Sequence, residues 1–188
     1  MKKSLFLLFA IFAFVSTSAQ TKVAGVTVPN NVSFEGEKME LNGAGVREKF
    51  WMDMYAGALY LAAPTADARA IINSNQPKAI KLHIVSGLIT SEKMIEAVNE
   101  GFENATKGKT APISSEIAKF KSYFSEKINK NDVFDIVYLP SKGVKVYRNG
   151  KESGTIEGKE FSKALFGIWL SEKPADEHLK NAMLGKRS

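Results

Sequence analysis

The stretch NGAGVREKFWMDMYAGALYLAA contains the side chains most suited to bind a ligand. It places one arginine, Arg47, at the start of a run of aromatic and aliphatic residues. A guanidinium stays charged and can bind a carboxylate through two parallel hydrogen bonds. In a partly dry cleft this contact would orient an acidic ligand, while each buried methylene of the ligand would add about 0.8 kcal/mol. The alternative is that Arg47 is a surface residue paired with Glu48 or another acid.

Residues that alternate along an unbroken strand face the same side, so Arg47, Trp51 and Tyr55 are predicted to share one face. Trp51 could be core or pocket wall, and Tyr55 could be a core residue or a hydrogen-bond donor to a ligand. Lys49 and Asp53 share the same parity and make this face less apolar. We therefore expect a mixed surface with a charged rim.

The sequence argues against several other kinds of site. It contains no cysteine, and its histidines, His83 and His178, have no partner at metal-binding spacing, so no metal is expected. It has no GxSxG elbow, phosphate-binding glycine loop or dinucleotide fingerprint, so no cofactor is expected. The net charge is +6, but the basic residues are interleaved with acids, which is not typical of a nucleic-acid-binding surface.

The first residues are typical of a secretory signal peptide. A pair of lysines precedes the apolar run LFLLFAIFAFV, and Thr17 and Ala19 occupy the small-residue positions of a cleavage site. We expect cleavage after Ala19, which would divide the chain into a signal peptide (1–19) and one domain (20–188), periplasmic or secreted. The apolar run is shorter than the roughly 20 residues of a spanning helix, and no later stretch reaches that length, so no transmembrane segment is expected after its removal.

The order of the expected elements predicts an α+β fold. A mostly antiparallel sheet should carry helices on one face, because the regular strand–helix alternation of a doubly wound fold is missing. The expected strands are 24–34 (broken at Pro29), 38–46, 47–63, 79–87, 133–140, 143–150 and 151–158, and the expected helices are 65–75, 90–108, 114–128, 159–170 and 175–184.

Two segments, NGAGVREKFWMDMYAGALYL and FSKALFGIWLSEKPADEHLKNAMLG, resemble the chalcone isomerase-like family, and more closely its bacterial secreted branch. The resemblance extends over nearly all of the chain after the leader. It implies an open-faced β-sandwich, with a ligand cleft between a large sheet and its helices. In the plant enzymes of this family, the arginine after the glycines holds the substrate and its developing oxyanion. In the fatty-acid-binding relatives, the same arginine holds a carboxylate in an apolar cleft.

The resemblance carries over to this chain in part. Arg47 matches the arginine, Tyr55 falls where the enzymes have threonine, and Asn99 matches a helix asparagine. The helix tyrosine of the enzymes has no match, and their late serine or threonine falls on Gly167 or Ile168, which have no hydroxyl. These departures argue against the cyclisation activity. Phe102 and Ile168 are added as residues that could line the helical wall of the cleft.

Three functions remain open at this point. The first is an exported, non-catalytic protein that binds a fatty acid or another small amphipathic carboxylate. The second is an isomerase or intramolecular lyase acting on a conjugated ketone, with Arg47 and Tyr55 as the catalytic candidates. The third is a structural or partner-binding module whose own side chains fill the cleft.

Overall fold

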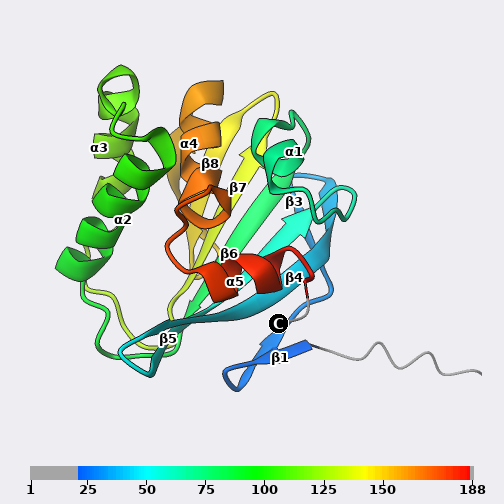
Figure 1. Cartoon of the computed structure of the whole chain (residues 1–188), viewed down its shortest axis with the longest axis vertical. Helices are drawn as coiled ribbons and strands as arrows, with labels where there is room; N and C mark the ends of the chain where they lie inside the picture. Colours follow the sequence, from blue (N-terminus) through cyan, green and yellow to red (C-terminus); the bar gives the residue numbers. More distant parts are fainter. Residues whose placement is uncertain (1–20, 187–188) are drawn as a thin grey trace, which may run out of the picture.

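The computed structural model describes residues 21–186, so the predicted leader and its cleavage site lie outside the described residues. Seven antiparallel strands form one sheet in sequence order from β3 to β9, and β1 pairs with β2 in a separate hairpin (Figure 1). The strands are β1 (Thr21–Val23), β2 (Val26–Val28), β3 (Asn31–Phe34), β4 (Glu37–Lys49), β5 (Met52–Leu61), β6 (Lys78–Ile84), β7 (Val133–Leu139), β8 (Gly143–Arg148) and β9 (Lys151–Ile156).

The helices gather on one face of this sheet (Figure 1). The predicted α+β fold, an open-faced sandwich with an antiparallel sheet, is therefore confirmed. Among the described residues, no helix combines the length and hydropathy that a bilayer span requires. The helices are α1 (Ala68–Asn73), α2 (Ser91–Thr106), the short 3-10 turn η1 (Ala111–Ile113), α3 (Ser114–Ser122), α4 (Lys159–Leu170) and α5 (Glu177–Met183).

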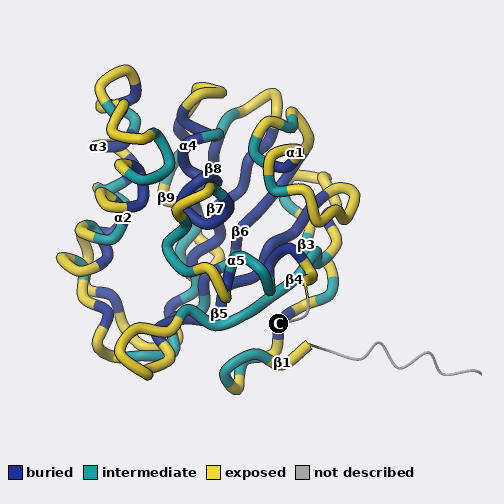
Figure 2. Tube along the Cα trace, in the orientation of Figure 1, coloured by how far each residue is buried: buried dark blue, intermediate teal, exposed yellow. Residues whose placement is uncertain are grey.

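Helix α2 shows how the sequence pattern builds the core. The side chain of Thr90 caps the helix by accepting a hydrogen bond from the Lys93 backbone N–H at 3.3 Å. Met94, Val98 and Phe102 follow at helical spacing and are all buried in the main core cluster. Buried and exposed positions therefore alternate along α2 (Figure 2).

The predicted single strand over 47–63 is wrong, because the chain reverses at Phe50 and Trp51. The preceding residues Arg47 to Lys49 extend β4, and Met52 begins β5, which pairs back with Lys49. The pattern gave no warning, since the turn contains two aromatic residues and none of the Gly, Asn or Asp residues that usually signal a hairpin. The assumption of an unbroken strand behind the Arg47–Trp51–Tyr55 alignment therefore fails.

Helix α5 lies across β4 and β5 at a place where the strands carry glycines. Gly45 and Gly57 are register partners, and a Cβ on Gly45 would lie 2.6 Å from the Ala182 Cβ. A Cβ on Gly57 would lie 2.9 Å from the end of the Met183 side chain and 3.1 Å from Leu179. Helix α5 is therefore the element that approaches these two glycines closely.

Lys78 is a buried cation beneath α1, with 2% of its surface exposed. Its Nζ donates hydrogen bonds to the carbonyl oxygens of Ile71 (3.0 Å) and Ser74 (2.8 Å) at the end of that helix. The same atom lies 4.7 Å from the ring centroid of Tyr138. Burial, followed by the charges of Lys159 and Lys163, lowers the pKa of Lys78 from 10.5 to about 8.

This lowered pKa predicts a rise in stability at alkaline pH. Between about pH 8 and 10.5 the unfolded chain holds a proton on Lys78 that the folded protein has released, so the free energy of unfolding increases with pH. One proton limits the slope to about 1.4 kcal/mol per pH unit. Urea unfolding across this window should show the rise in the parent protein and not in Lys78→Met. The same replacement at exposed Lys22 should leave the rise in place, and an equal rise in Lys78→Met would refute the assignment.

Candidate ligand-binding site

The fold brings Arg47 and Tyr55 together on the helix-covered face of the sheet. They are register partners on β4 and β5, next to an irregularity between Arg47 and Glu48. The Arg47 guanidinium carbon lies 5.9 Å from the centroid of the Tyr55 ring. The predicted convergence of these two side chains is thus present in the structure.

Tyr55 is almost fully buried, with 3% of its surface exposed. Its hydroxyl oxygen accepts a hydrogen bond from the indole Nε1 of Trp169 on α4 at 2.9 Å. Burial raises the pKa of Tyr55, and the Arg47 guanidinium and the Trp169 hydrogen bond oppose this only in part. Tyr55 is therefore a neutral phenol whose oxygen is already used as an acceptor, and its own proton remains available to a ligand oxygen.

Arg47 carries a buried donor that is not satisfied. Its Nε is shielded from solvent and has no hydrogen-bond partner within residues 21–186. A buried donor left without a partner costs about 1–3 kcal/mol, so each such group requires an explanation. The alternative of an ion pair with Glu48 is not observed among the described residues. An oxygen-bearing ligand would supply the missing acceptor.

Arg47 and Tyr55 line a cleft of about 250 Å³ between the β4–β5 hairpin, the loop before α2, and α2 itself. Most of its wall is apolar, and the charged side chains belong to the hairpin end and to one side of α2. The remaining lining residues are Lys49, Phe50, Met52, Met54, Leu88, Ile89, Lys93, Met94, Glu96, Ala97 and Glu100.

The size and flexibility of this cleft suit a small ligand. Its volume of about 250 Å³ lies just below the usual range for ligand pockets, about 300–1,000 Å³. Three of the lining residues are methionines, Met52, Met54 and Met94. Their unbranched side chains repack readily around an irregular ligand. Arg47 and Tyr55 supply polar groups from the strands, and Lys93, Glu96 and Glu100 supply charges from α2. The exposed side chains of Phe50 and Leu88 mark the mouth of the cleft.

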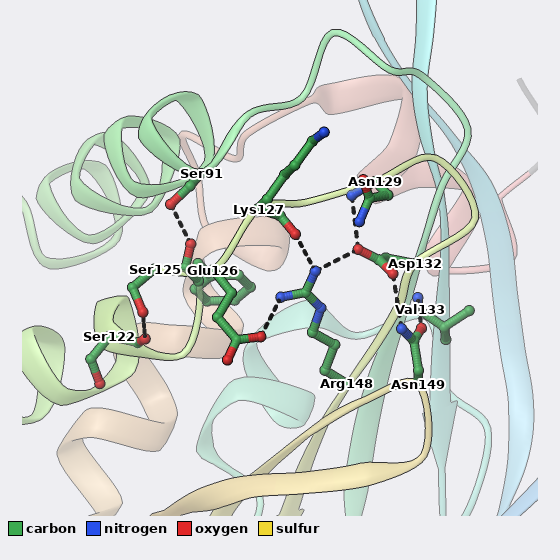
Figure 3. Close-up of polar contacts among 11 residues, drawn as sticks. Ser91, Ser122, Ser125, Glu126, Lys127, Asn129, Asp132, Val133, Arg148 and Asn149 are labelled. Atoms are coloured by element: carbon green, nitrogen blue, oxygen red, sulfur yellow. Dashed lines mark hydrogen bonds and ion pairs between the residues drawn. The ribbon is translucent and has the colours of Figure 1, made fainter.

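A polar cluster at the end of the sheet lies beside the end of β6, from which the loop before α2 begins (Figure 3). The Asp132 carboxylate accepts hydrogen bonds from Arg148 (2.7 Å), Asn149 (2.8 Å) and the Asn129 backbone (2.8 Å). Burial raises the pKa of Asp132, but these donors outweigh it and leave the pKa below its ordinary value. The backbone oxygen of Asp132 in turn accepts from the Ile84 N–H at 2.9 Å, at the start of that loop.

The other residues predicted from the sequence lie elsewhere. Trp51 is 95% exposed at the β4–β5 turn and does not line the cleft. Asn99 is exposed on α2, outside the cleft. Phe102 and Ile168 are buried core residues: Phe102 packs against Phe161 with ring centroids 5.6 Å apart, and Ile168 contacts α2 near Gly101. The structure thus keeps Arg47 and Tyr55 as a pair and separates them from these four.

Several residues of the site were not predicted from the sequence. Trp169 was not among the candidates, yet its indole N–H donates to the Tyr55 hydroxyl from a position 114 residues further along the chain. Leu88, Ile89 and Lys93 come from a loop and the first turn of a helix, where neither spacing nor composition indicates a ligand. Only the three-dimensional meeting of hairpin, loop and helix identifies them.

A larger groove of about 1120 Å³ lies near the carboxyl ends of α2 and α4, beside α1 and α5. Two of its cations are paired, because Arg69 and Lys107 each contact the Glu172 carboxylate at 3.1 Å. We place the candidate site at Arg47, whose shielded Nε has no hydrogen-bond partner among the described residues. Within the described chain, no group of three or more His, Cys, Asp or Glu side chains could hold a metal ion.

Comparison with known proteins gives the chain a family and a structural neighbour. A family model described as chalcone isomerase-like matches residues 20–185. A search of curated protein sequences found no significant match. Among solved structures, the fold is similar to that of a fatty-acid binding protein from Arabidopsis thaliana, with a TM-score of 0.68 and 18% sequence identity, over 85% of this chain and 92% of the plant chain.

Proposed function

Because the chain belongs to the chalcone isomerase-like family, we propose that it binds a fatty acid or a similar small amphipathic carboxylate, without catalysis, in the Arg47 cleft. The observation that carries this proposal is the shielded Arg47 Nε, which has no hydrogen-bond partner among the described residues, on a residue that lines a mostly apolar cleft. A carboxylate would complete the hydrogen bonds of Arg47 and accept from Tyr55, and the alkyl chain would extend along the methionines toward the mouth. The plant structural neighbour, described as fatty-acid binding, supports the same ligand class.

The cleft volume favours medium chains over long ones. About 250 Å³ accommodates the head group and the first part of an alkyl chain. A longer chain would have to displace Met54 or Met94, or leave through the mouth beside Leu88. Binding should therefore gain less from each methylene once the cleft is full, since the later methylenes are no longer removed from water.

We further propose that residues 1–19 export the protein and that the ligand is met outside the cytoplasm. The support is the sequence itself: paired lysines, a short apolar run and small residues before Ala19. A protein in that compartment would meet lipids released from membranes and carboxylates taken up from outside.

The proposal is tested with protein isolated from its natural host without detergent. Native mass spectrometry should detect a retained mass of lipid size, and the polypeptide mass should correspond to a chain beginning at Gln20. Calorimetric titration of delipidated protein with decanoate should give a dissociation constant of about 1–100 μM. Decanol, which keeps the alkyl chain but lacks the carboxylate, should bind at least tenfold more weakly. Equal binding of decanol and decanoate would refute a carboxylate-specific site.

One observation also favours a second candidate, an isomerase or intramolecular lyase acting on a conjugated ketone. A guanidinium and a neutral phenol that converge on one cleft could stabilise a developing oxyanion. A ketone of this kind should then be consumed by the parent protein and not by Arg47→Met. If no conjugated ketone turns over, binding alone accounts for the site.

A further inference from the structure

The large hydrophobic side chains that the described structure exposes gather at one point. They are Phe50 (73% exposed), Trp51 (95%), Met52 (42%) and Leu88 (46%). Three of them line the mouth of the cleft, and Trp51 is their neighbour in the β4–β5 turn. Together these four residues are called the apolar tip. A soluble protein rarely clusters such side chains in water unless they contact something.

The backbone of the turn is strained at these two aromatic residues. Phe50 and Trp51 have positive φ angles of 51° and 61°. Within residues 21–186, three other two-residue hairpins also have positive φ at both turn positions. Each has glycine at the second position: Ala24-Gly25, Glu35-Gly36 and Asn149-Gly150. Glycine adopts this conformation without strain, whereas an aromatic residue does not. The β4–β5 turn therefore keeps a tryptophan where the other three hairpins have glycine.

We propose that the apolar tip docks into the interfacial layer of a lipid bilayer. Tryptophan is favoured at the boundary between headgroups and acyl chains, because its ring is apolar and its N–H is polar. Two cations flank the tip: the Lys49 Nζ lies 5.7 Å from the Phe50 ring centroid, and the Lys93 Nζ donates to the Leu88 carbonyl at 3.1 Å. Lysines in these positions would meet anionic headgroups while the apolar side chains enter the layer below.

The acidic residues lie behind the tip. Exposed Glu48 and Asp53 are register partners one position further from the turn than Lys49 and Met52. Glu96 and Glu100 lie one and two helical turns further along α2 from Lys93, away from the loop that carries Leu88. The tip is also poorly suited to a second copy of this chain. A stable protein interface buries about 800 Å² on each partner, and a protruding two-residue turn with one loop residue presents far less surface. A bilayer imposes no such requirement, because it closes around a small projection.

Docking at the tip would place the mouth of the cleft at the membrane surface. Phe50, Met52 and Leu88 belong to both the tip and the cleft wall, so an acyl chain could pass from the bilayer to the cleft along apolar side chains. This exchange step rests on the proposed function, whereas the docking rests on the tip alone.

The experiment uses the chain without its leader and vesicles of equal parts phosphatidylcholine and phosphatidylglycerol. The parent protein should sediment with the vesicles. Trp51→Gly, which matches the neighbouring hairpins, should bind them about tenfold more weakly, as expected for losing one large apolar contact. It should also melt about 2–4 °C higher, because the turn is relieved of strain. Trp51→Phe should retain vesicle binding. It should lose the blue shift in tryptophan emission that the parent protein is expected to show on docking, because its remaining tryptophan is the buried Trp169.

The outcomes distinguish membrane docking of the apolar tip from ligand binding in the cleft. Equal vesicle binding by the parent protein and Trp51→Gly would overturn docking, as would a self-association that Trp51→Gly abolishes in the absence of any vesicle binding. Trp51 does not line the cleft, so decanoate titration without vesicles should be unchanged in Trp51→Gly. If the parent protein binds vesicles but no decanoate, the proposed function fails and the docking stands.

Discussion

Replacing Arg47 with methionine is expected to weaken decanoate binding about 30- to 100-fold, which corresponds to about 2–3 kcal/mol. Methionine has a similar reach and keeps the wall apolar, so the change removes the charge and the donors while filling most of the space. The Tyr55 hydroxyl would remain as a single neutral donor, and a neutral hydrogen bond contributes less than a charge-assisted one. Calorimetric titration of both proteins measures the difference.

Two controls identify the source of that loss. The methyl ester of decanoate has no charge for the guanidinium to bind, so its affinity should change less than about threefold in Arg47→Met. Arg69→Met makes the same replacement in the larger groove, where Arg69 contacts Glu172 at 3.1 Å, and it should leave decanoate binding unchanged. If Arg69→Met weakened binding and Arg47→Met did not, the ligand would occupy the larger groove and the Arg47 site would be wrong.

Arg47→Met should also separate function from stability. In the ligand-free protein the Arg47 Nε is a buried donor without a partner, so removing it relieves a penalty. We expect the free energy of unfolding to stay the same or to rise by about 1 kcal/mol, although ligand binding is lost. A structural arginine would behave in the opposite way, with a loss of stability.

Features that depend on neighbouring residues could be predicted from the sequence, and features that depend on the path of the chain could not. The helix expected over 90–108 corresponds to α2, because its apolar stripe and its Thr90 cap are local features that act within a few residues. The pairing of Arg47 with Tyr55 was reached by counting alternation through an unbroken strand. The two residues do share a face, but they reach it across a hairpin whose turn falls between them.

That same turn explains why Trp51 was misplaced. A two-residue hairpin is recognised by its Asn or Gly, and Phe50-Trp51 has neither, so local propensity favoured a continuous strand. Strained sites of this kind are where sequence reasoning should fail, since the residue is retained for something other than the turn. The Tyr55–Trp169 hydrogen bond is a different kind of miss. It depends on the height of α4 above the sheet, which is set by packing rather than by any local pattern.

Gly43 on β4 packs directly against the end of α5. A Cβ added to Gly43 would lie 2.1 Å from the Ala182 carbonyl oxygen and 2.8 Å from that of Met183. Both are backbone atoms at the end of α5, so no side-chain rotation relieves the clash. The Asn42 Nδ2 donates to the same Met183 oxygen at 2.8 Å, which fixes the helix end at this spot.

Gly43→Ala is therefore expected to lower the free energy of unfolding by about 2–4 kcal/mol, because α5 must lift and expose Leu179 and Met183. Gly87→Ala is the matched control: nothing lies within 4 Å of its added Cβ, so its stability should stay equal or rise by up to about 1 kcal/mol. Urea unfolding of the three proteins measures the difference.

Since Asp176 at the start of α5 accepts a hydrogen bond from the Glu48 backbone at 3.4 Å, a lifted α5 should also loosen the strand end that carries Arg47 and weaken decanoate binding. Equal stability of both variants would mean that the helix rests on the sheet without depending on Gly43.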